Sequence, residues 1–167
     1  RKENFLYDEP HYHESIEIIY LIRGKATAHL SGATYDLEAG DIFICNKKLL
    51  HFYKNYSANT LALCLVMSNK YTHDLRELHK NALFPAFLAN KEYNAQIYQL
   101  MQTWFDYKGR TFLVDCAFAN LLFDKIIKLH TVLRQYEKGG VMEYILTTEN
   151  LTKIYGKHRA ADEINIH

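Results

Sequence analysis

The chain has 167 residues, enough for one domain or for one domain with an appendage. Hydrophobic residues make up 49% and aromatic residues 14%, so a proper core is expected, whereas a formal net charge of +1 lacks the basic excess of a nucleic-acid-binding surface. Three cysteines without a C-x-x-C pair favour free thiols in a reducing cytoplasm, and without a signal peptide or a long apolar run no membrane insertion is expected.

The first half of the chain has the pattern of a β structure. Strand-like runs occupy residues 16–22, 26–31, 33–37, 41–45, 49–56 and 60–68. Turn residues separate them, and Ser31–Gly32 in particular suits a hairpin. Short strands at this close spacing predict a barrel or a sandwich.

After residue 70 the apolar period becomes helical. Residues 91–107 place apolar side chains at helical spacing, and Lys108–Gly109 ends that helix. Thr111 can cap a second helix that runs to about Glu137 and stops at Gly139–Gly140. Residues 141–155 are expected to form a short helix, a turn and the start of another helix. A β half followed by an α half predicts an α+β fold.

Candidate chemistry is concentrated in the segment HYHESIEIIYLIRG, which begins at His11. Alternate residues of an extended strand share a face, so His11 and His13 project to one side. Glu17 has the same parity and joins them if the strand has no bulge. A second segment, GDIFICNKKLLHFYKN, carries His51. Three imidazoles and one carboxylate can therefore converge inside a small barrel.

The same parity argument extends the candidate site. Tyr53 and Asn55 share the parity of His51, and Ile19 and Leu21 follow Glu17 inward. An apolar floor with a few convergent polar groups is what a small-molecule site needs. The predicted ligand-binding residues are His11, His13, Glu17, Ile19, Leu21, His51, Tyr53 and Asn55.

Three interpretations of the polar residues are open. In the first, His11, His13, Glu17 and His51 hold a divalent transition metal, such as zinc, iron, nickel or manganese, with coordination positions left for catalysis. In the second, the same side chains line a metal-free pocket for an organic ligand. In the third, the histidines are structural and form no site. The metal-free pocket is preferred, so no cofactor is expected.

The second helix carries a heptad-like seam. Its members repeat at alternating spacings of four and three and are Leu122, Ile126, Leu129, Leu133 and Tyr136. A neighbouring stripe consists of Cys116, Ala119, Phe123 and Ile127. Because this apolar surface exceeds what one small barrel usually covers, we predict that the seam contacts a second subunit in a homodimer. The alternative is that both stripes belong to the core of one chain.

The two histidine-bearing segments resemble the cupin motifs. The first fills every fixed position of His-x-His-x3-Glu-x6-Gly. The second matches Gly-x5-Pro-x-Gly-x2-His-x3-Asn at Gly40, His51 and Asn55, whereas Asn46 and Lys48 stand in place of Pro and Gly. The phrases EIIYLIRG and YDLEAGDIFICN are also similar to the sensor domains of AraC-type transcription regulators.

That resemblance covers residues 1–70 by motif and reaches about residue 155 by the order of elements. It implies a cupin-like β-barrel sensor (double-stranded β-helix) over residues 1–90 and a helical dimerisation subdomain over 91–138. Residues 139–167 would be a linker and the incomplete start of a helix-turn-helix domain, because MEYILTTENLTKIY is similar to the segment that opens such domains. DNA would be bound only through that absent or incomplete domain.

Two functions follow from the resemblance. The preferred one is a non-enzymatic sensor in which a small-molecule effector enters the barrel and shifts the conformational population of a dimer. The alternative is a metal-dependent cupin enzyme, an oxygenase or isomerase, that uses His11, His13, Glu17 and His51. The complete first motif favours the enzyme, whereas the altered second motif and the seam helix favour the sensor. No G-x-S-x-G, P-loop or GxGxxG motif is present.

Overall fold

The computed structural model describes residues 6, 8–73, 83–139, 148–155 and 158–166. The chain divides into two compact units, Arg1–Leu129 and His130–His167, which are described separately.

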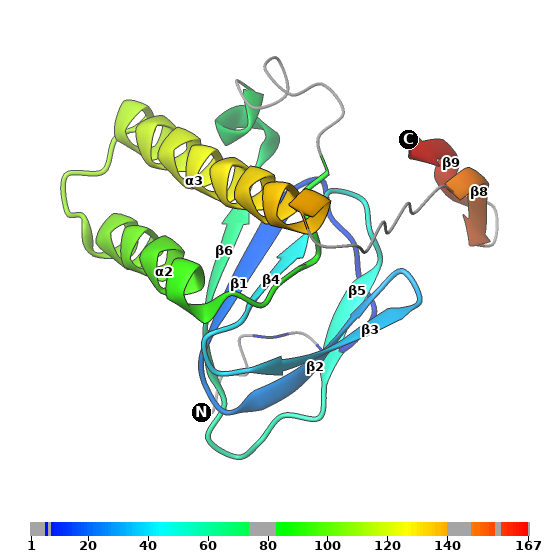
Figure 1. The fold of residues 1–167 in the computed structure, drawn as a ribbon, viewed down its shortest axis with the longest axis horizontal. Helices are drawn as coiled ribbons and strands as arrows, with labels where there is room; N and C mark the ends of the chain where they lie inside the picture. The colour runs from blue at the N-terminus through cyan, green and yellow to red at the C-terminus, as the bar shows by residue number, and fades with distance from the viewer. Residues whose placement is uncertain (1–5, 7, 74–82, 140–147, 156–157, 167) are drawn as a thin grey trace. The chain divides into compact units, whose positions relative to one another are not determined.

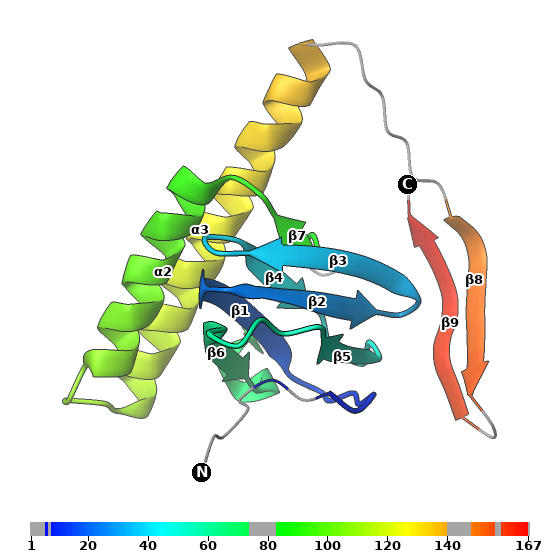
Figure 2. The same ribbon diagram turned by 90° about the horizontal axis from the view of Figure 1, so that it is seen from below.

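The first unit contains two antiparallel sheets (Figures 1 and 2). One sheet has the strand order β6-β1-β4-β7 and the other the order β3-β2-β5. The strands are β1 (Ile16–Arg23), β2 (Lys25–Leu30), β3 (Ala33–Glu38), β4 (Ile42–Cys45), β5 (His51–Lys54), β6 (Leu61–Met67) and β7 (Phe87–Leu88). The six predicted strands are all confirmed, and β7 is an addition. The fold is cupin-like, with the strands preceding the helices as predicted.

A tight hairpin joins β2 to β3. Ser31 and Gly32 have φ angles of 47° and 96°, so both central residues are left-handed, as in the turn type that matches the twist of two antiparallel strands. Leu30 and Ala33 are therefore direct partners across the hairpin. This outcome agrees with the turn predicted from the Ser-Gly pair.

The alternation of side chains along β1 divides the interior into two cores. Ile19 and Leu21 point to the core between the two sheets, together with Phe43 of β4 and Tyr53 of β5. Ile16 and Ile18 belong to the core on the other face of the four-stranded sheet. Glu17 has the parity of Ile19, so the strand itself directs this carboxylate between the sheets.

Two helices cover the outer face of the four-stranded sheet (Figure 1). They are α2 (Lys91–Asp106) and α3 (Phe112–Gly139), and a short 3-10 helix η1 (Asn69–Tyr71) follows β6. Asn90 caps α2 by accepting a bond from the Tyr93 amide, and the Thr111 hydroxyl accepts one from Val114, as predicted for a cap. Within the described part of the chain, none of the helices has the apolar length that a bilayer crossing requires.

The seam residues Leu122, Ile126 and Leu129 lie in the core of their own chain. Their exposed fractions are 0%, 0% and 7%, and they pack with the outer face of the four-stranded sheet and with α2. These three side chains therefore belong to the core of one chain, which is the alternative that the sequence left open. Leu133 and Tyr136 lie outside the residues whose side chains the structure describes.

The second unit corrects the helix start expected at the end of residues 141–155, whereas the part of that range up to residue 147 lies outside the described residues. It contains β8 (Thr148–Tyr155) and β9 (His158–Ile166), which pair antiparallel. The run from Leu151 to Tyr155 includes β-branched and aromatic residues, which favour an extended backbone. Residues 148–155 and 158–166 therefore form two paired strands instead of the start of a helix-turn-helix domain, which was expected over 139–167.

Candidate functional site

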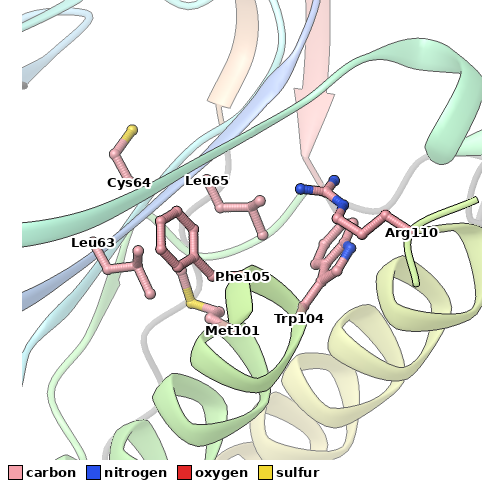
Figure 3. Close-up of a pocket in the computed structure, with 7 residues that line it drawn as sticks. All are labelled: Leu63, Cys64, Leu65, Met101, Trp104, Phe105 and Arg110. Carbon is pink, nitrogen blue, oxygen red and sulfur yellow. The ribbon is translucent and has the colours of Figure 1, made fainter. Parts of the chain in front are cut away.

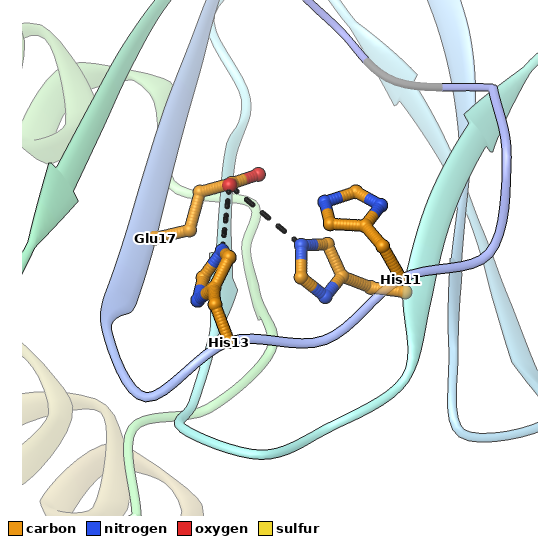
Figure 4. Close-up of side chains that lie close together, drawn as sticks. His11, His13 and Glu17 are labelled. Carbon is orange, nitrogen blue, oxygen red and sulfur yellow. Dashed lines mark hydrogen bonds and ion pairs between the residues drawn. The ribbon is translucent and has the colours of Figure 1, made fainter.

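Four predicted residues, His11, His13, Glu17 and His51, converge and are called the histidine cluster from here on. The candidate ligand atoms, one from each side chain, all lie within 4.8 Å of one another. Figure 4 shows the imidazoles of His11 and His13 near the carboxylate of Glu17. The ring centroids of His11 and His13 lie 4.2 and 5.0 Å from that of His51.

The convergence is as predicted, but its local cause differs. β1 begins only at Ile16, and a bend at Glu14–Ser15 precedes it, so His11 and His13 are not on a continuous strand with Glu17. His11 instead pairs with His51, each backbone amide donating to the other's carbonyl oxygen at 3.0 and 2.9 Å. This two-residue bridge anchors the incoming segment beside β5.

Glu17 is the electrostatic centre of the cluster. It is only 5% exposed, and the Tyr53 hydroxyl donates a 2.6 Å hydrogen bond to its Oε1. Its Oε2 lies 3.2 Å from His13 Nε2 and 3.6 Å from His51 Nε2. Burial raises the pKa of Glu17, but the attraction of His51 and the bonds to Tyr53 and His13 outweigh it and lower that pKa to about 2. The carboxylate is therefore charged at neutral pH.

The floor of the site is apolar and closely packed. Ile19 and Leu21 are fully buried there, as predicted, and Tyr53 is 1% exposed. Burial raises the pKa of Tyr53, so its phenol stays a neutral donor. Burial, with the nearby charge of Glu17, also raises the pKa of the Cys45 thiol to about 12. A thiol held protonated in this way is not a nucleophile.

Asn55 is the one predicted site residue that the structure places elsewhere. β5 ends at Lys54, and Asn55 adopts a left-handed φ of 55°, so the parity of the strand no longer applies. Asn55 is exposed, and its Nδ2 donates to the hydroxyl of Thr27 at 3.2 Å. The structure therefore does not bring Asn55 to the other predicted site residues, contrary to the parity argument.

Lys48 supports the site in a way that sequence reasoning missed. It has a left-handed φ of 62°, and its backbone amide donates to the His13 carbonyl oxygen at 2.9 Å. The signal was available, because motif two has Gly at this position and Gly favours positive φ. The local backbone of the motif is thus kept although its glycine is lost.

A separate cavity lies outside the core between the sheets, next to β6 and α2 (Figure 3). Its volume is about 40 Å³, and its lining includes Leu63, Leu65, Met101, Phe105 and Arg110. That volume holds a water molecule but not an organic effector. It therefore does not compete with the histidine cluster as the candidate site.

Comparison with known proteins gives a consistent fold. The family model of the AraC-like ligand binding domain matches residues 1–105. The solved structure of an apo ToxT variant from Vibrio cholerae strain SCE256 is 14% identical, covers 84% of this chain and 55% of that chain, and has a TM-score of 0.53. The AraC-like transcriptional activator CuxR is 9% identical, covers 78% of this chain and 54% of that chain, and has a TM-score of 0.51.

A third structure is more distant. Oxalate decarboxylase from Bacillus subtilis is 22% identical over 40% of this chain and 19% of that chain, and its TM-score of 0.34 is too low to carry an argument. No curated protein matches the sequence. The chain spans about half the length of the ToxT and CuxR structures.

Proposed function

The chain belongs to the family of AraC-like ligand binding domains, and on that premise we propose that it senses a small-molecule effector for a dimeric transcription regulator. The observation that carries this proposal is the histidine cluster itself. A charged carboxylate between two apolar sheets costs several kcal/mol of desolvation, in order of magnitude, unless partners compensate it. Tyr53, His13 and His51 supply that compensation for Glu17, and the cluster in this way keeps several polar groups directed at one point between the sheets, where an effector can contact them.

In this proposal the effector changes the population of conformations in the regulator, and DNA is contacted by residues outside the sensor. The near-neutral charge of the chain, +1, agrees with that division of roles. A metal-dependent oxygenase or isomerase is the alternative function, and it lacks the support that the family gives to the sensor.

The sensing proposal can be tested by thermal unfolding with three probes: a monosaccharide, an aromatic acid and a dicarboxylic acid. We expect one class to raise Tm, because a ligand at 100 times its Kd stabilises the folded state by about 2.7 kcal/mol. Glu17→Gln should abolish the rise, whereas His29→Ala, on the opposite face of β2, should retain it. If an effector raises the Tm of the Glu17→Gln variant as much as that of the wild type, the effector binds outside the histidine cluster.

We further propose that the homodimer contact uses the outer face of α3. Leu113 and Leu121 are 79% and 57% exposed and lie two helical turns apart, with exposed Ala117 between them. They form an apolar strip on the face opposite the buried residues Leu122 and Ile126. An exposed strip of this kind on an amphipathic helix suits a symmetric helix pair.

The dimer prediction can be tested by sedimentation velocity. Leu113→Glu with Leu121→Glu places four carboxylates across a two-fold interface, and we expect a folded monomer. Leu83→Glu changes a residue that is 59% exposed but not on a helix, and this variant should remain dimeric. A dimer that persists in the double variant would exclude this face.

A further inference from the structure

We propose that the chain has a second ligand site, an open cavity between η1 and the start of α3 that binds a small aromatic carboxylate. The volume of this cavity, about 590 Å³, falls within the range of small-molecule sites. Its lining includes Lys70 and Tyr71 of η1 and Phe112 and Cys116 of α3. The described lining shares no residue with the histidine cluster, so the inference goes beyond the proposed function and does not depend on it.

The first argument is the apolar wall of the cavity. The rings of Tyr71 and Phe112 lie 5.6 Å apart and are tilted by 38°, so they join η1 to α3. Phe112 nevertheless remains 54% exposed, and Leu113 beside it is 79% exposed. A planar ring packed on this wall would remove apolar surface from water and would meet ring faces that suit stacking. The wall therefore favours a ligand with an aromatic ring.

The second argument is the position of the Lys70 ammonium group. Its Nζ lies 4.6 Å from the ring centroid of Tyr71 and 5.9 Å from that of Phe112, so the two rings hold the charge at the cavity. Within the part of the chain that the structure describes, Lys70 makes no hydrogen bond or ion pair. An ammonium group has three N–H donors, and these remain for a carboxylate, which accepts the strongest bonds from a charged donor.

The third argument is the balance of charge around the cavity. Its described lining carries a lysine and a histidine but no acidic residue. The carboxylate of Asp115 is close enough to feel the charge of Lys70, but its Oδ1 already accepts bonds from Trp104 Nε1 at 2.8 Å and from Arg110 Nε at 3.0 Å. Because this carboxylate is paired with its own cation, the charge of Lys70 is left to attract an anion.

The ring faces and the ammonium group together define the class of ligand. A planar molecule can stack on Phe112 while its carboxylate accepts hydrogen bonds from Lys70. Inorganic phosphate would satisfy the ammonium group alone, and a neutral aromatic compound would satisfy the rings alone. The combination therefore points to a molecule that carries both groups.

The first experiment uses the Cys116 thiol, which lines the cavity, as a reporter. Burial, with the nearby charge of Glu17, raises the pKa of the Cys45 and Cys64 thiols to about 12, so both stay protonated at neutral pH and react slowly. Iodoacetamide should therefore label mainly Cys116, and Cys116→Ser should remove that labelling. We expect 2-naphthoate at about five times its Kd to slow the labelling about sixfold, because about one site in six is then free.

Calorimetry measures the Kd of 2-naphthoate directly, and two further probes separate the roles of the rings and the charge. 2-Naphthol has the rings without the carboxylate, and acetate has the carboxylate without the rings, so each should bind at least about tenfold more weakly. Lys70→Gln should weaken 2-naphthoate about tenfold. Lys54→Gln is the matched control, because it removes another lysine that lies over a ring, 5.1 Å from that of Phe52, outside the cavity.

Equal affinity of 2-naphthoate for the wild type and Lys70→Gln, or unchanged labelling of Cys116 in its presence, overturns the inference. The test is separate from that of the sensing function, because Glu17→Gln should bind 2-naphthoate as the wild type does. Loss of 2-naphthoate binding in Glu17→Gln would place the ligand in the histidine cluster and contradict a second site. Circular dichroism checks that each variant is folded, and Leu113 is left unchanged because it also belongs to the proposed dimer contact.

Discussion

Replacing Ile126 with alanine should lower the free energy of unfolding by about 3 kcal/mol. Ile126 is 0% exposed and belongs to the core that α3 forms with α2 and the outer face of the four-stranded sheet. The substitution removes three carbon atoms from a closely packed layer that can relax only in part. Urea denaturation at several protein concentrations measures the effect, as a lower midpoint with an unchanged m value.

Leu83, which lies outside the proposed dimer contact, is the control. Its side chain is 59% exposed, so Leu83→Ala should change the free energy of unfolding by no more than about 0.5 kcal/mol. A seam between subunits would give the opposite pattern for Ile126→Ala: a loss of stability that disappears on dilution below the dissociation constant of the dimer. That result would show that Ile126 lies at the subunit interface, as first predicted.

Gly24→Ala should cost about 2–4 kcal/mol, from a left-handed alanine and from overpacking together. Gly24 joins β1 to β2 with a φ of +83°. A methyl group there would lie 2.6 Å from Ser57 Oγ and 2.7 Å from the Cα and Oγ1 of Thr60. The backbone of Thr60 cannot yield easily, because its hydroxyl donates to the Lys25 carbonyl oxygen at 2.8 Å.

Gly109 provides the comparison for Gly24. Gly109 does not have a positive φ, and the nearest atoms that an added methyl group would meet belong to the side chain of Tyr107, at 3.2 Å and beyond. Gly109→Ala should therefore stay within about 1 kcal/mol of the wild type. Thermal unfolding followed by circular dichroism ranks the two variants, and equal Tm values would contradict the tight turn at Gly24.

The strands were predictable because their signals are local. A short, almost continuous apolar run predicted the strand that became Ile16–Arg23, and the Ser31–Gly32 pair predicted the hairpin, without any knowledge of long-range contacts. The same method fails where a strand ends, since parity applies only to extended backbone. The run 49–56 was expected as one strand, β5 covers only His51–Lys54, and Asn55 was misplaced for that reason.

The members of the histidine cluster were predictable, but the direction of their rings was not. Residue types and spacing indicated His11, His13, Glu17 and His51. The bonds that orient the rings go to backbone carbonyl oxygens, which every residue has and which leave no trace in a sequence. The sequence therefore could not choose between a metal site and a metal-free pocket.

The two faces of α3 were also beyond the reach of sequence. A repeat with spacings of four and three is the same whether the facing surface belongs to the same chain or to another. The choice depends on where the sheet lies, and the sheet covers Leu122 and Ile126 but leaves Leu121 exposed. For residues 148–155, β-branched and aromatic side chains outweighed the helical spacing expected there.

Strand β1 has a consequence for how such a domain diversifies. Its odd-numbered residues Glu17 and Ile19 face the interior between the sheets, whereas Ile16 and Ile18 face the helices. Adjacent residues of β1 thus contribute to two different surfaces, one between the sheets and one against the helices. Substitutions at odd positions change the lining of the proposed ligand site while the helical layer keeps its packing, and substitutions at even positions do the reverse. One strand of eight residues thus allows the interior between the sheets and the helix packing to evolve separately.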